Sequence, residues 1–292
     1  MNFADELMKA IDKKQNPSIV GLDPRIESIP ESVKEGKTEA EAFLAFNKGI
    51  IDAVCDTVPA VKPQNAFYEQ YGAEGVRAYI DTIKYAKSKG LLVVGDVKRN
   101  DIGSTAKAYA QAHLGKAFGL DAVTVNAYLG TDGIKPFLEK TPEGKGIFVL
   151  VKTSNPSSGE LQDKLLDDGR SVYEAMAELV KGWGKENEGT RGYNSVGAVV
   201  GATYPKEAEL LRKIMPKTIF LVPGYGAQGG GADDVVPCFN EDGYGGIVNS
   251  SRGIIFAYKK LGGDFDEAAG KAAEAMREDL KKSLSKAGKW PW

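Results

Sequence analysis

The sequence has few of the residues on which several common kinds of site depend. Its 292 residues include only two cysteines, Cys55 and Cys238, and one histidine, His113. The cysteines form no C-x-x-C pair, which argues against a disulfide framework and against a Cys/His metal site. A single histidine also makes a Ser-His-Asp mechanism a poor candidate. We therefore interpret all three residues as structural and expect no metal site.

The chain also lacks an excess of charge and a long apolar run. Its 38 Lys and Arg residues nearly balance 40 Asp and Glu residues. This balance gives no general attraction for nucleic acid, so an anionic ligand must be held by a local site. No stretch of about 20 apolar residues occurs, and the N-terminus is amphipathic and charged, unlike a signal peptide. We expect a soluble, cytoplasmic protein with no nucleic-acid or membrane partner.

Eight short runs rich in Val, Ile and Leu alternate with longer amphipathic segments. The runs are nearly continuous in apolar residues, as in strands that are covered on both faces. Eight such strands alternating with helices predict a single (β/α)8 TIM barrel over residues 1–292, although length alone would allow two domains. An open doubly wound sheet is the alternative. The expected strands cover residues 18–23, 59–63, 91–98, 122–127, 146–154, 196–203, 218–223 and 245–251.

Three other segments carry expectations of their own. Residues 153–170 form a connection that is long for a βα loop, which favours a lid that closes over a ligand. Residues 184–194 are expected to form a solvated loop before the sixth strand. The C-terminal Trp-Pro-Trp could cap the barrel or contact a partner. Amphipathic segments predict helices over residues 39–54, 72–90, 171–186 and 205–216.

Polar and charged residues gather at the C-terminal ends of the expected strands. In a closed barrel these ends converge on one mouth, where TIM barrels carry out their chemistry. This distribution favours the barrel over the open sheet. The residues are Asp23, Lys62, Asp96, Lys98, Asn126, Thr153, Ser154, Gln228, Ser251 and Arg252.

The segment GDVKRNDIGSTAKAYA at 95–110 is the most informative one. Asp96 and Lys98 are two positions apart on an expected strand, so their side chains should share a face. A buried carboxylate needs a partner, and Lys98 can supply it. Asp101 follows just past the strand end, and Lys62 comes from the neighbouring strand. An ion-pair network that only fills the rim is one interpretation, but a charged cluster in a cleft favours a functional site.

At residues 96–102, D-V-K-R-N-D-I resembles the Asp-x-Lys-x-x-Asp-Ile signature of the orotidine 5′-phosphate decarboxylases, and its context is similar to the longer bacterial-type branch of that family. Further motifs follow the family in order along most of the chain, and their co-occurrence is far more specific than any one of them. They are GLDPR at 21–25, VKPQNAFYEQYG at 61–72, VTVNAYLG at 123–130, KTSNPSS at 152–158, PGYGAQGG at 223–230 and VNSSRG at 248–253.

The resemblance implies decarboxylation of orotidine 5′-phosphate to uridine 5′-phosphate in de novo pyrimidine biosynthesis, without a cofactor. It implies that Lys98 protonates C6 of the pyrimidine and that Asp96 sits beside the substrate carboxylate. Asp101 would act in the site of the partner subunit of a homodimer. The resemblance also implies contacts with each part of the substrate. Lys62 and Asp23 would contact the ribose hydroxyls, and Ser154 the pyrimidine edge. Gln228 and Arg252 would contact the phosphate, with Ser251 beside Arg252, and Ile102 and Thr105 would lie alongside Asp101.

One motif points to a different class of enzyme. The segment GYGAQG at 224–229 matches G-x-G-x-x-G, the fingerprint of nicotinamide dinucleotide sites, but alone it is a weak signal. It follows the seventh expected strand, and no strand ends in an acidic residue about 20 positions later. The loops after strands 7 and 8 are the usual phosphate site of a TIM barrel. We therefore favour a monophosphate, held with help from Arg252.

Two alternatives remain on the same barrel. Sugar-phosphate decarboxylases and synthases share Asp-x-Lys-x-x-Asp but use Mg²⁺, which is bound by an acidic residue on the second strand. This chain has Lys62 at that position, which disfavours a divalent cation. The other alternative is a barrel that binds a phosphate ligand without catalysing a reaction.

Overall fold

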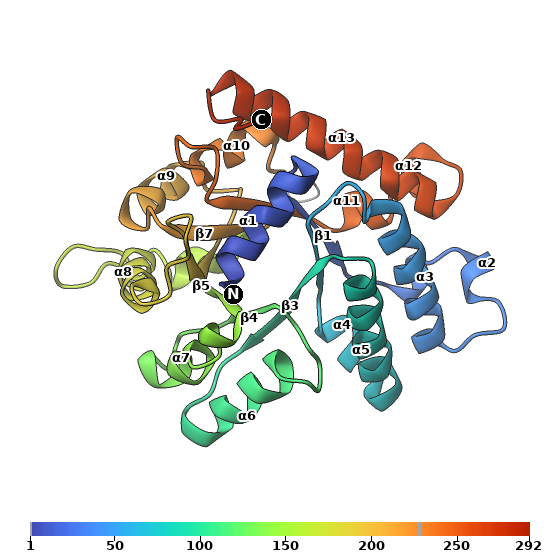
Figure 1. Cartoon of the computed structure of the whole chain (residues 1–292), viewed down its shortest axis with the longest axis horizontal. Helices are drawn as coiled ribbons and strands as arrows, with labels where there is room; N and C mark the ends of the chain where they lie inside the picture. Colours follow the sequence, from blue (N-terminus) through green and yellow to red (C-terminus); the bar gives the residue numbers. More distant parts are fainter. Residues whose placement is uncertain (1, 227–228) are drawn as a thin grey trace.

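The computed structural model describes residues 2–226 and 229–292. In this part of the chain, eight parallel strands follow one another around a closed barrel, and the last strand pairs with the first (Figure 1). The closed barrel confirms the expected TIM fold and excludes the open doubly wound sheet. The strands are β1 (Ser18–Leu22), β2 (Ala60–Pro63), β3 (Leu92–Arg99), β4 (Ala122–Val125), β5 (Gly146–Lys152), β6 (Asn194–Val200), β7 (Thr218–Val222) and β8 (Gly246–Ser250).

Burial on two faces explains why the strands are continuous in apolar residues. Successive side chains of a strand point to opposite faces. On β1, Ile19 packs inside the barrel, whereas Val20 packs between the strands and the surrounding helices. On β4, Ala122 and Val123 divide in the same way. Each strand thus contributes apolar side chains both to the barrel interior and to the layer between strands and helices. Polar residues therefore occur mainly at the strand ends.

Helices surround the barrel, and the four that the sequence predicts are confirmed. Capping boxes begin two of them, with Thr38 and Glu41 on α3 and with Ser171 and Glu174 on α8. No helix in residues 2–226 and 229–292 is long and apolar enough to cross a membrane. The helices are α1 (Phe3–Lys14), α2 (Glu31–Lys34), α3 (Glu39–Val54), α4 (Ala66–Glu69), α5 (Gly72–Ser88), α6 (Gly103–Leu114), α7 (Thr131–Leu138), α8 (Val172–Gly184), α9 (Pro205–Ile214), α10 (Ala232–Val235), α11 (Arg252–Ile255), α12 (Tyr258–Leu261) and α13 (Phe265–Lys286).

Helix α1 covers one end of the barrel. Figure 1 shows it lying across the middle of the ring of strands. Its buried side chains, including Phe3 and Leu7, belong to the same apolar cluster as Ile19 and Phe148 inside the barrel. The N-terminal ends of the strands are therefore closed, and a site can form only at their C-terminal ends.

The expected solvated loop at 184–194 is partly wrong, because this loop is tied to α1. The backbone N–H of Thr190 donates to Asp5 at 2.9 Å, and Arg191 forms an ion pair with Asp12 at 2.5 Å. The Nε1 of Trp292 also donates to Asp12, at 3.1 Å. Of the two roles considered for the C-terminal Trp-Pro-Trp, the structure thus supports capping of the barrel.

The two cysteines and the single histidine lie away from the open end of the barrel. Cys238 is buried and Cys55 is partly exposed, and both are free thiols. His113 lies on α6 and is 2% exposed. Burial and, to a smaller extent, the nearby Arg99 guanidinium lower the pKa of His113 to about 4. The imidazole Nε2 accepts a hydrogen bond from Arg99 Nε at 3.3 Å, so the neutral ring is the form that fits.

We expect His113 to make the protein less stable in mild acid. Its pKa in the unfolded chain is about 6.5, so between about pH 6.5 and 4 the unfolded chain binds a proton that the folded protein does not. The stability that His113 contributes above this window is lost as the pH falls through it, and the loss approaches about 3 kcal/mol.

The variant His113→Gln separates this effect from the titration of the carboxylates. The sequence has one histidine, so wild type and variant share every other titrating side chain. Urea unfolding between neutral pH and about pH 5 should give a smaller loss of unfolding free energy for the variant. Equal losses in the two proteins would contradict the prediction.

Candidate active site

A cavity of about 500 Å³ opens at the C-terminal ends of the strands. Its volume lies within the range of small-molecule sites. Most of the residues that the sequence analysis selected meet here, from five different strands or the loops that follow them. They are Asp23, Lys62, Asp96, Lys98, Thr153, Ser154, Ser251 and Arg252.

Three charged side chains form the centre of this cavity. The ammonium of Lys62 lies 2.8 Å from Oδ2 of Asp96, and the ammonium of Lys98 contacts Oδ1 of the same carboxylate. The side chains of Lys62 and Asp96 are 5% and 12% exposed, whereas that of Lys98 is 45% exposed. Asp96 thus joins a buried cation to one that reaches into the open cavity.

The electrostatics keep this array charged. Burial alone would raise the pKa of Asp96, but the ammonium groups of Lys62 and Lys98 outweigh burial and hold that pKa well below its usual value. Burial alone would lower the pKa of Lys62, but the carboxylates of Asp96 and Asp23 raise it. The ionised forms of the array therefore stabilise one another, which is the condition for a charge to remain buried.

The backbone at Lys98 differs from the expected extended strand. Its φ is 43°, in the left-handed region that side chains other than glycine seldom adopt. The pairing of β3 with β4 is irregular between Gly95 and Arg99. Asp96 and Lys98 do reach the same cavity, but they do so through a distorted strand end and not through the regular alternation of a strand.

Two buried side-chain oxygens of cavity residues have no hydrogen-bond partner within residues 2–226 and 229–292. They are Oδ1 of Asp23, after β1, and Oδ1 of Asn249, on β8. Buried acceptors without a partner are costly, and a ligand that carries donors would relieve the cost. Hydroxyl groups are donors of this kind.

The loops after β7 and β8 form the other end of the cavity. Ser251 precedes α11, and Arg252 is its first residue. A side chain at Gly21 would lie 1.8 Å from Ser251 Oγ, so the glycine leaves the space that this hydroxyl occupies. Gln228, which was expected to bind here, lies outside the described residues. The helix after β7 is α10, which has four residues, so the G-x-G-x-x-G segment does not open a long dinucleotide-binding helix.

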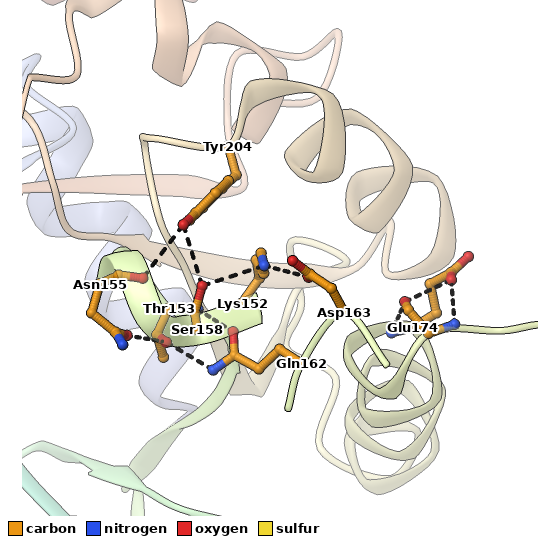
Figure 2. A network of polar contacts seen from close by, with 9 residues as sticks. Lys152, Thr153, Asn155, Ser158, Gln162, Asp163, Glu174 and Tyr204 are labelled. Carbon is orange, nitrogen blue, oxygen red and sulfur yellow. Dashed lines mark hydrogen bonds and ion pairs between the residues drawn. The ribbon is translucent and has the colours of Figure 1, made fainter. Parts of the chain in front are cut away.

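The long connection after β5 is held by Lys152, at the end of that strand (Figure 2). Lys152 is fully buried, and its ammonium lies 2.5 Å from Asp163 and 4.4 Å from the centre of the Tyr204 ring. A second set of bonds joins Gln162 to Thr153, through the backbone N–H at 3.0 Å and the hydroxyl at 2.8 Å. The first part of the connection is therefore fixed above the cavity, with Ser154 on its lining.

Four selected residues do not line this cavity as far as the chain is described. The side chain of Asp101 accepts a hydrogen bond from the N–H of Ile102 at 2.8 Å. Ile102 is 51% exposed, and Thr105 is exposed on α6. Asn126 instead accepts a hydrogen bond from the N–H of Tyr128 at 3.0 Å, within its own loop.

The structure adds cavity residues that the sequence analysis missed. Asn249 stands within the VNSSRG motif, so its place at a strand end was a usable signal. Thr124 lies inside an apolar run and gave no such signal, because only the pairing of β3 with β4 brings it beside Asp96. Gln162 comes from the long connection, and Gln64 and Tyr225 follow β2 and β7.

A TIM barrel with alternating opposite charges at its mouth is an enzyme scaffold for a small anionic ligand. The model of the orotidine 5′-phosphate decarboxylase / HUMPS family matches residues 17–261. The chain belongs to this family, and the expectation drawn from its motifs is confirmed.

Individual relatives agree with the family match. The orotidine 5′-phosphate decarboxylase of Rhodopirellula baltica is 50% identical over 273 residues, which cover 89% of this chain and 90% of the relative. That of Caldicellulosiruptor bescii is 43% identical and covers 98% of this chain and 100% of the relative. The solved structure of Leishmania donovani OMP decarboxylase aligns with a TM-score of 0.79 at 33% identity, over 97% of this chain and 98% of the other.

Proposed function

We propose that this chain decarboxylates orotidine 5′-phosphate to uridine 5′-phosphate. The observation that carries the proposal is the Lys62–Asp96–Lys98 array, which places one partly exposed cation of a charged network in a cavity of nucleotide size. The relatives that match nearly the full chain bear the name of this activity.

The array suits the chemistry of the reaction. Loss of CO₂ breaks the bond between C6 and the carboxylate and leaves the electron pair on C6, in the plane of the ring. No π-system can delocalise that pair, so fixed charges must stabilise it. The ammonium of Lys98 attracts the developing charge and then transfers a proton to C6, and solvent returns the proton to the Lys98 amine. Asp96 holds Lys98 in place beside C6, and Asp101 of the partner subunit is assigned the same role.

The remaining cavity residues suit the other parts of the nucleotide. The unpaired carboxylate oxygen of Asp23 fits a ribose hydroxyl, and Lys62 adds a donor beside it. Ser154 is assigned to the pyrimidine edge. Arg252 is assigned to the phosphate, with Ser251 beside it, because guanidinium binds phosphate oxygens in pairs. We also assign Gln228 to the phosphate, on the resemblance alone.

The rival sugar-phosphate reaction requires Mg²⁺. Lys62 lies 2.8 Å from Asp96, so an ammonium occupies the place where a cation would otherwise bind that carboxylate. The test is the decay of orotidine 5′-phosphate absorbance with purified protein treated with EDTA. Full activity after chelation supports the proposal. Absence of turnover with or without Mg²⁺, together with no binding of uridine 5′-phosphate, supports the rival. Binding of uridine 5′-phosphate without turnover of substrate supports a barrel that only binds.

We predict that Arg252→Ala mainly weakens binding. Loss of a charge-assisted contact with phosphate should raise KM by about 10- to 100-fold. The phosphate is remote from C6, so saturating substrate should restore much of the rate. Steady-state kinetics give both constants, and an unchanged KM would count against the phosphate assignment.

The connection at 153–170 is proposed to close over the nucleotide. Its first part is fixed by Lys152, whereas residues 164–170 are exposed. Uridine 5′-phosphate should therefore slow amide hydrogen exchange across this connection and reduce the exposure of Ser154. Identical exchange with and without the nucleotide would argue against a lid.

A homodimer in which Asp101 enters the partner's site completes the proposal. Asp101 lies outside the cavity of its own chain, at the start of a loop that exposes Ile102. The next βα loop exposes two further large apolar side chains, Tyr128 at 72% and Leu129 at 44%. Exposed apolar groups beside a functional residue suit a surface that another subunit covers.

A further inference from the structure

We propose that Thr124 is a positioning residue for Lys98, a role that rests on the proposed decarboxylation. Thr124 lies on β4, is 1% exposed and lines the cavity. Its hydroxyl donates to Oδ1 of Asp96 at 3.0 Å. The hydroxyl oxygen of Thr124 also accepts hydrogen bonds from the backbone N–H groups of Val97 at 3.0 Å and Lys98 at 2.9 Å. A hydroxyl has one proton to donate and two lone pairs, so these three bonds use all of its capacity.

The bonds fall where β3 loses its regular pairing. The register of β3 with β4 shifts between Gly95 and Arg99, so the N–H groups of Val97 and Lys98 need other acceptors. The positive φ of Lys98 is unfavourable for a residue with a side chain and persists only where neighbours hold it. The Thr124 hydroxyl supplies the acceptor for these N–H groups and thereby stabilises the backbone conformation of Lys98.

The hydroxyl also sets the rotation of the Asp96 carboxylate. Oδ2 faces Lys62 at 2.8 Å, and Oδ1 faces Lys98 and Thr124. Without the bond from Thr124, the carboxylate has fewer restraints on how it divides between the two ammonium groups. One side chain therefore fixes the backbone of Lys98 and the carboxylate that its ammonium contacts.

The neighbouring strands show that this part of the wall does not require a hydroxyl for packing. Next to Thr124 around the cavity, β5, β6 and β7 present Leu150, Val199 and Leu221. A valine at position 124 would match them in shape and polarity. The bonds with Asp96 and Lys98 are what distinguish threonine at this position.

The test compares Thr124→Val, which keeps the shape of the side chain, with Thr124→Ser, which keeps the hydroxyl. For Thr124→Val we expect kcat to fall by about 100-fold, because a shift of about 1 Å in a reacting group has that effect. KM should change little, since the ribose and phosphate contacts lie elsewhere. Thr124→Ser should restore most of kcat.

Thr82→Val is the matched control. It removes another fully buried threonine hydroxyl, which is bonded to Asn47 at 3.1 Å, and kcat should stay near the wild-type value.

Should Thr124→Val fail to fold, Thr124→Ala and Thr124→Ser form a pair that differs by one oxygen, and the same division between kcat and KM applies. A valine or alanine variant with wild-type kcat, or a serine variant as slow as the alanine one, would overturn the proposal.

Crystal structures of these variants provide a readout that does not depend on activity. The ammonium of Lys98 should leave Asp96 when the hydroxyl is absent and remain with it in Thr124→Ser, and an unmoved Lys98 would also overturn the proposal. If the wild type fails to release CO₂ from orotidine 5′-phosphate, the proposed reaction is wrong, and the structures still decide the role of Thr124.

Discussion

The variant Lys98→Ala is expected to bind uridine 5′-phosphate almost as well as the wild type while its kcat falls by at least about 10⁴-fold. The variant loses both the cation that stabilises the C6 carbanion and the proton that the carbanion receives. The product carries no carboxylate at C6, and its ribose and phosphate are assigned to other residues of the cavity, so the contacts proposed to hold it remain.

Calorimetric titration with uridine 5′-phosphate and the absorbance assay with orotidine 5′-phosphate measure the two effects separately. Lys282→Ala, which removes an exposed lysine from α13, is the control for loss of an ammonium group without an active-site role. Turnover near the wild-type level in Lys98→Ala would refute the assignment of the proton donor. If Lys98→Ala loses both product binding and turnover, Lys98 mainly holds the ligand.

A mixture of Lys98→Ala and Asp101→Ala is expected to regain activity that neither variant has alone. In a mixed dimer, the subunit with intact Lys98 receives intact Asp101 from its partner, so one of its two sites is complete. Random exchange of subunits makes half of the dimers mixed, and about a quarter of all sites should then be active. The gain follows from the position of Asp101, which lies outside the cavity of its own chain.

The control is a mixture of Lys98→Ala with Asp96→Ala. Both of these residues line the cavity of the same chain, so exchange of subunits produces no complete site. Activity should be measured after mixing and incubation, with size-exclusion chromatography to verify the dimer. If Asp101→Ala is active alone, or if both mixtures stay inactive although subunits exchange, the proposal that Asp101 acts in trans is wrong.

Local pattern was enough to predict the strands and several helices. Each barrel strand is buried on both faces, so its sequence is a short apolar run, and eight such runs alternating with helices leave few folds other than a closed barrel. The helix expected at 39–54 has those limits in the structure, because a capping box fixes its start. The family, too, was evident from sequence, since its motifs occur in order.

The candidate site could be predicted only in part. Strand ends converge in a barrel, so residues such as Lys62 and Ser154 were expected to meet before any geometry was known. That reasoning selects polar residues at strand ends, and it therefore missed Thr124, which follows two apolar residues within β4. It also assumed an extended backbone at Lys98, where the left-handed φ depends on bonds from the neighbouring strand.

The sequence by itself determined the barrel, the family and the charged residues at the mouth, because apolar periodicity and motif spacing are properties of neighbouring positions. Closure and register of the barrel decided the rest: the division of the Asp96 carboxylate between Lys62 and Lys98, the support from Thr124, and the attachment of residues 184–194 to α1. Each of these depends on distances between residues far apart in the chain, which become defined only when packing brings their strands and loops together.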